Sequence, residues 1–109
     1  RDFIFSEELA EWMLVALVKA PSCVPINLGS GKGYSIKELA ETVARCVPEP
    51  PQIYWDPTKP SGDHIRILSV ERAKKLIGFE LKISLEYGIK RTVDWFLSNK
   101  ELAQKKGKG

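Results

Sequence analysis

The chain has 109 residues, 43% of them hydrophobic, and a formal net charge of +3 at pH 7. This length allows one domain with a modest core and is smaller than most complete enzymes. The two cysteines, Cys23 and Cys46, have no second cysteine or histidine at ligand spacing, which argues against a zinc site. Without a signal peptide or an apolar run that could span a bilayer, we expect a cytoplasmic protein with no membrane partner.

The positive charge is concentrated at the C-terminus. Residues 1–99 carry 13 basic and 13 acidic groups, whereas residues 100–109 carry four lysines and one glutamate. No aromatic residue lies among these lysines to stack on bases. We therefore divide the chain into a lobe, 1–99, and a basic flexible tail, 100–109, and expect no nucleic-acid partner.

A first helix is predicted from Ser6 to about Ala20. Glu7 and Glu8 fall in its first turn, where the helix dipole favours acidic side chains. Apolar residues cover most of this helix rather than one stripe. We therefore expect it to be packed on more than one side, with an apolar face for a partner or for self-association.

A strand, a glycine-rich loop and a second helix are predicted between Val24 and Val47. Three glycines in 29–33 permit a tight turn, and Ser35 with Glu38 forms the pattern of a capping box. The glycine spacing matches neither a P-loop nor a dinucleotide-binding fingerprint. We therefore favour a structural turn over a cofactor site.

Prolines end the second helix before a short strand at 53–55. The segment that follows, 56–63, contains two prolines, a glycine and two aspartates, and Lys59 and Arg66 make it a candidate anion-binding loop. The alternative is a solvated surface turn. Ser69 is predicted to cap a helix over 70–77 and Ser84 to open the last helix.

These elements predict an α/β fold with about four helices and a few short strands. The strands that begin at Val24 and Gln52 are expected to be parallel, because a helix connects them. His64 is the only histidine, and no nucleophile or pair of carboxylates has the spacing of a catalytic set. We assign no catalytic residue and no metal ligand.

Five segments, taken in order, resemble the C-terminal part of NAD-dependent epimerase/dehydratases, the extended short-chain dehydrogenases that act on nucleotide sugars. The Lys-Pro-x-Gly loop is most similar to GDP-fucose synthases and the last helix equally similar to dTDP-glucose dehydratases. The segments are Arg1–Phe5, Ile26–Gly31 with Ser35–Leu39, Lys59–Asp63, Ala73–Phe79, and Ser84–Ile89 with Thr92–Leu97.

The resemblance implies a substrate-binding lobe without its catalytic half. In this family an N-terminal Rossmann domain binds NAD or NADP through the motif G-x-x-G-x-x-G and supplies a catalytic Tyr-x-x-x-Lys pair. Neither of these two motifs occurs here. The implied partners are that absent Rossmann domain and a GDP-, UDP- or dTDP-linked sugar. The chain itself is expected to hold no cofactor and to be inactive alone. The alternative is a free-standing binding module with the same fold.

The resemblance also implies the substrate-binding residues. It places Arg1 on the pyrophosphate, where a guanidinium matches phosphate oxygens. It places Asn27 against the substrate, and the loop from Lys59 through His64 to Arg66 over the nucleotide. Ile65 and Ser69 depart from the family pattern, which often has Arg and Asp at these positions.

Overall fold

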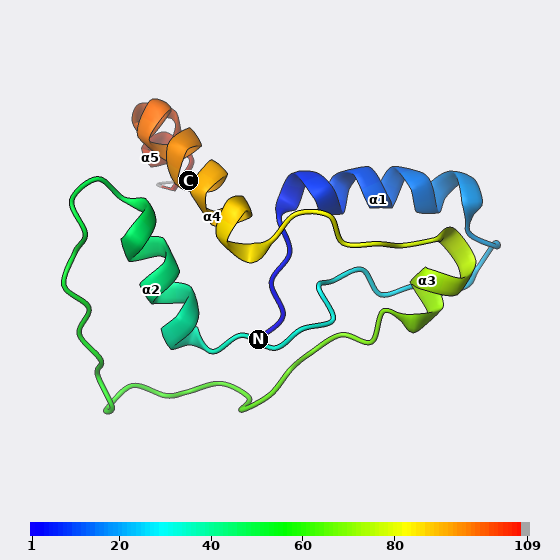
Figure 1. The fold of residues 1–109 in the computed structure, drawn as a ribbon, viewed down its shortest axis with the longest axis horizontal. Coiled ribbons are helices and arrows are strands. Elements are labelled where there is room, and N and C mark those ends of the chain that lie inside the picture. Colours follow the sequence, from blue (N-terminus) through cyan, green and yellow to red (C-terminus); the bar gives the residue numbers. More distant parts are fainter. Residues whose placement is uncertain (108–109) are drawn as a thin grey trace.

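The computed structural model describes residues 1–107, which form five helices (Figure 1). Helix α1 packs against α3, and α2 packs against α4. The loop between α2 and α3 is long and returns along the outside of α2 before it reaches α3 (Figure 1). The helices are α1 (Ser6–Lys19), α2 (Ile36–Cys46), α3 (Glu71–Ile77), α4 (Leu85–Ser98) and α5 (Lys100–Gly107).

The predicted strands are wrong: over residues 1–107 the fold is a small helical domain without strands. The segments 24–28 and 53–55 have no regular secondary structure. A strand forms only where a neighbouring backbone exchanges hydrogen bonds with it. One such exchange occurs outside the two predicted strand segments, between Arg1 and Tyr34. Their nitrogens donate to each other's carbonyl oxygens at 2.7 and 2.8 Å. The four predicted helices are confirmed.

Two of the predicted helix starts are confirmed in atomic detail. Ser35 Oγ accepts from the Glu38 nitrogen at 3.0 Å, while Glu38 Oε2 accepts from the Ser35 nitrogen at 2.7 Å. The bond from the Ser35 backbone lowers the pKa of Glu38, as is usual for an acid at a helix N-terminus. Ser84 caps α4 by accepting from the Tyr87 nitrogen at 3.2 Å.

The predicted start of α3 is wrong. Its N-cap is Val70, which makes no side-chain capping bond, and the helix begins at Glu71. The carbonyl of Ser69 accepts a bond from Asn27 Nδ2 at 3.4 Å, and in this chain the serine side chain caps nothing. The C-terminal end agrees with expectation, because Gly78 has a φ of 67° and closes the helix in the left-handed conformation.

The core lies between α1 and α3. Val70, Ala73, Ile77 and Phe79 are buried there. Trp12 of α1 packs on the edge of Phe79, with ring centroids 5.1 Å apart. The inner face of α1 thus belongs to the core, as its apolar pattern predicted.

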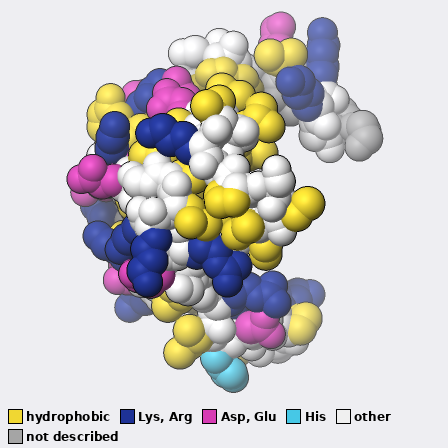
Figure 2. All heavy atoms as spheres, turned by 90° about the vertical axis from the view of Figure 1, so that its right-hand side faces the viewer, with side chains coloured by type: hydrophobic (Ala, Val, Ile, Leu, Met, Phe, Trp, Pro, Cys, Tyr) yellow, Lys and Arg dark blue, Asp and Glu magenta, His cyan; other side chains and the backbone are white. Residues whose placement is uncertain are grey.

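The opposite face of α1 is apolar and exposed. Leu17 and Val18 are 81% and 84% exposed, and Met13 and Leu14 lie beside them. Figure 2, which views the end of the molecule that carries α1 and α3, shows hydrophobic side chains at the surface between basic ones. A partner or a second copy on this face stays a prediction. No helix within residues 1–107 is both long and apolar enough to cross a membrane.

The predicted tail contains α5, which has no buried residue. Residues 100–107 form this helix, and residues 108–109 lie outside the described part of the chain. The division into a lobe, 1–99, and a tail, 100–109, stays a prediction.

Glu8 plays a structural role that its place in the first turn did not predict. Its side chain is 2% exposed, and the carboxylate accepts from the Lys82 nitrogen at 2.5 Å and the Ile83 nitrogen at 3.0 Å. It thereby joins α1 to the segment that leads into α4. Its neighbour Glu7 forms a surface ion pair with Arg91 at 2.7 Å.

Replacement of Glu8 by glutamine should lower the free energy of unfolding by about 2 kcal/mol or more, because one buried N–H would face an amide NH₂ instead of an acceptor. Glu7→Gln is the matched control and should cost less than about 1 kcal/mol, since exposed ion pairs contribute little. Urea unfolding followed by circular dichroism measures both. Equal losses would contradict the role assigned to Glu8.

Candidate functional site

A hollow of about 830 Å³ lies between the loop that follows α2 and the turn that starts α2. Its wall combines cationic, aromatic and aliphatic side chains, which is the mixture found in many ligand sites. The wall consists of backbone from the glycine-rich turn and of side chains that include Arg1, Tyr34, Ile36, Trp55, Asp56, Lys59, Pro60, Asp63, His64, Ile65 and Ile67.

Arg1 is held at the hollow by its backbone and its side chain. The backbone pairs with Tyr34, and the guanidinium Nη1 donates to the carbonyl oxygen of Asp63. Glycine at residue 62 permits this approach, because a Cβ there would lie 2.5 Å from Arg1 Nη2 and would displace the guanidinium. The chain start and the proline-rich loop therefore meet at this arginine.

Three of the five predicted site residues, Arg1, Lys59 and His64, line the same hollow. Arg66 lies next to it and pairs with the Asp63 carboxylate at 3.2 Å, with both side chains largely exposed. Asn27 is not on the wall of the hollow, and its amide is bonded to the Ser69 carbonyl. The structure thus brings Arg1, Lys59 and His64 together, with Arg66 beside them, but not Asn27.

Asp2 is the residue that the sequence interpretation missed. Its Oδ1 accepts from the nitrogen and hydroxyl of Ser30 at 2.7 and 2.6 Å. Its Oδ2 accepts from the nitrogens of Gly31 at 3.0 Å and Leu68 at 3.2 Å. Partial burial raises the pKa of Asp2, but these hydrogen bonds outweigh it and hold the pKa below its usual value. The only hint in the sequence is an acidic residue next to Arg1. The role of Asp2 could not be predicted from it, because the hydrogen-bond partners lie 28 to 66 residues away.

The glycine-rich loop is occupied by this carboxylate. Two N–H groups that could receive a phosphate, those of Ser30 and Gly31, already donate to Asp2. Gly31 has a φ of 68°, and a Cβ at Gly33 would lie 2.7 Å from Ile67 Cδ1. Left-handed backbone and close approach thus account for these glycines, in line with a structural turn.

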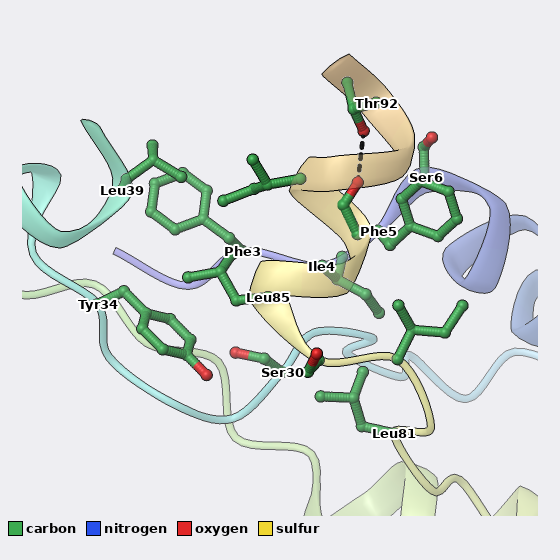
Figure 3. A pocket seen from close by; sticks show the side chains of 14 residues that line it. Phe3, Ile4, Phe5, Ser6, Ser30, Tyr34, Leu39, Leu81, Leu85 and Thr92 are labelled. Atoms are coloured by element: carbon green, nitrogen blue, oxygen red, sulfur yellow. Dashed lines mark hydrogen bonds between the residues drawn. The ribbon is translucent and has the colours of Figure 1, made fainter. Parts of the chain in front are cut away.

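A second cavity, of about 290 Å³, lies between the chain start, α2 and α4 (Figure 3). Phe3, Leu39 and Leu85 point into it, and none of the described residues on its wall carries a charge. The hydroxyl of Thr92 donates to the Gly88 carbonyl at 2.8 Å. This apolar space between helices lacks the groups that an anionic ligand needs.

No family model and no solved structure matches the chain. It is 33% identical over 99 residues to GDP-L-fucose synthase 1 of Arabidopsis thaliana, covering 91% of the chain and 30% of that protein. It is 38% identical over 81 residues to GDP-L-fucose synthase of Escherichia coli (strain K12), covering 74% and 25%. It is 34% identical over 109 residues to UDP-glucuronic acid decarboxylase 1 of Arabidopsis thaliana, covering 100% and 25%.

The resemblance to the NAD-dependent epimerase/dehydratase family is thus confirmed, and the chain is a homologue of a part of these proteins. It spans 25% to 30% of the length of these three curated relatives.

Asp2 should contribute to stability above its unfolded-state pKa, near 3.8, and this contribution should be lost as the pH falls through the lower folded-state pKa. The free energy of unfolding of Asp2→Asn should therefore fall less between about pH 4 and pH 2 than that of the wild type. Urea titrations at each pH measure the slope. Asp94→Asn, which removes only an exposed pair with Lys90, is the control. Parallel curves for wild type and Asp2→Asn would disprove this contribution.

Proposed function

We propose that this chain forms the nucleotide-sugar-binding part of an NAD(P)-dependent epimerase, dehydratase or reductase. The observation that carries the proposal is the placement of Arg1 and Lys59 on one hollow. The names of the relatives, GDP-L-fucose synthase and UDP-glucuronic acid decarboxylase, support a nucleotide sugar as the ligand. We assign hydride transfer and the NAD or NADP site to a Rossmann domain outside this chain, since Tyr-x-x-x-Lys is absent from it.

The charges around the hollow favour an anion. One Arg1 nitrogen is bonded to a carbonyl oxygen, which leaves other guanidinium donors for phosphate oxygens. Within residues 1–107 the Lys59 ammonium pairs with no carboxylate. Both acids on the wall have partners inside the loop: Asp63 pairs with Arg66, and Asp56 accepts two bonds from Thr58.

In this proposal Arg1 and Lys59 bind the pyrophosphate, Arg1 as a fixed fork and Lys59 as a point charge. His64 and Arg66, from the same loop, contact the nucleotide from the side that faces solvent. Asn27 would reach only a part of the substrate that extends beyond the hollow, because its amide lies at the entry to α3.

The second candidate function is a free-standing binding module. The observation that favours it is the exposed apolar face of α1, which offers a surface to another protein. The intact mass of the native protein separates the two candidates. Because the chain spans about 30% of a relative's length, a mass about three times its 12.3 kDa supports the enzyme part. A mass equal to it favours the module.

Inorganic pyrophosphate should bind the 109-residue chain, and Arg1→Met and Lys59→Met should each weaken binding by about tenfold or more, because each removes a charged donor. Isothermal titration calorimetry at fixed ionic strength measures this. Lys37→Met, on the exposed face of α2 in a pair with Glu41, is the control and should bind as the wild type does. An absence of binding, or an equal effect of Lys37→Met, would disprove the proposed phosphate site.

Gly62→Ala should weaken pyrophosphate binding with little change in the free energy of unfolding. The new Cβ would displace only the flexible end of Arg1 and not the backbone. Calorimetry and urea unfolding measure the two effects separately. Gly107→Ala, with open space around it, should change neither. A stability loss in Gly62→Ala that accounts for the weaker binding would contradict the role of glycine at this position.

A further inference from the structure

Trp55 is exposed on the wall of the hollow, although tryptophan usually buries most of its surface. Its side chain is 55% exposed. The two other tryptophans of the chain lie elsewhere: Trp12 packs on Phe79 in the core, and Trp95 of α4 is 50% exposed away from the hollow. Trp55 therefore offers an aromatic surface to whatever enters the hollow.

A tight turn connects Trp55 to Lys59, which lines the same hollow. Asp56, next to Trp55, accepts from the nitrogen and the hydroxyl of Thr58 at 3.0 and 2.6 Å. The carbonyl of Asp56 accepts from the Lys59 nitrogen at 3.3 Å. These bonds close a turn with Trp55 before it and Lys59 at its end, and Pro60 follows at once. The turn thus fixes the backbone of Trp55 and that of Lys59 relative to each other.

Arg1 completes the arrangement from another part of the chain. Its guanidinium is bonded to the Asp63 carbonyl, and it lines the same hollow as Trp55 and Lys59. An aromatic surface next to two cations suits a ligand that joins an aromatic ring to an anionic group through a short spacer. A nucleoside diphosphate has this form, with its base and its pyrophosphate separated by one sugar.

We propose that Trp55 stacks on the base of a nucleoside diphosphate whose pyrophosphate lies against Arg1 and Lys59. This inference rests on the proposed function and adds to it a residue that recognises the base. Stacking uses the π-face, which every base has, so Trp55 selects for the presence of a base and not for one particular base. Tyr54, its neighbour in sequence, is not on the wall of the hollow.

The test compares GDP, UDP, dTDP and inorganic pyrophosphate as ligands of the 109-residue chain. Calorimetry gives the affinities, and quenching of tryptophan fluorescence reports contact with the indole. Each nucleoside diphosphate should bind at least about fivefold more tightly than pyrophosphate, the size of one base–aromatic stack. Trp55→Leu should abolish this advantage and the quenching but leave pyrophosphate affinity unchanged. Trp55→Phe should retain most of the advantage.

Trp95→Leu is the matched control, because it removes an equally exposed tryptophan that does not line the hollow. It should change neither the affinities nor the ligand-induced quenching. If Trp55→Leu fails to fold, Trp55→Phe and the wild type still test the inference. The inference is overturned if the wild type binds nucleoside diphosphates no more tightly than it binds pyrophosphate.

The outcomes separate this inference from the proposed function. If pyrophosphate binds through Arg1 and Lys59 but a base adds nothing, or if Trp55→Leu weakens both kinds of ligand alike, the stacking role is overturned and the phosphate site stands. If neither pyrophosphate nor any nucleoside diphosphate binds, both are overturned.

Discussion

The carboxylate of Asp2 is the interaction on which the candidate site depends. It accepts hydrogen bonds from the glycine-rich loop and from Leu68, and so joins three segments that are far apart in the sequence. The chain around it has no sheet to align these segments, because residues 1–107 contain no strand. The position of Arg1, one residue earlier, follows from this anchor and from the backbone pairing with Tyr34.

The hollow and the core lie in different parts of the molecule and depend on different forces. Apolar burial between α1 and α3 stabilises the core, whereas hydrogen bonds of Arg1 and Asp2 to distant segments arrange the hollow. Loops of this kind tolerate changes of sequence, so the residues around the hollow can vary without loss of the helices. This separation is compatible with the proposed binding role, and the names of two relatives, GDP-L-fucose synthase and UDP-glucuronic acid decarboxylase, contain different nucleotides.

Local sequence signals predicted the helices well, whereas the family resemblance grouped three of the residues that line the hollow, whose binding role stays a prediction. The capping box of Ser35 and Glu38 and the left-handed Gly78 act within a few residues, and both are confirmed. Arg1, Lys59 and His64 were expected together from the family resemblance, and they line one hollow. The strands failed because each needs a neighbouring backbone that the local pattern could not supply. The Ser69 cap failed because α3 begins one residue later than predicted, with Val70 as its N-cap.

The sequence by itself determined the capped starts of α2 and α4 and the end of α3, because capping is a local property. It also indicated the family through five ordered segments. Only the tertiary structure decided the roles of the two acids. Glu8 and Asp2 bond to backbone groups up to 75 and 66 residues away along the chain, and no pattern around either one identifies those partners. Such contacts depend on how the chain returns in space, which is a property of the whole fold.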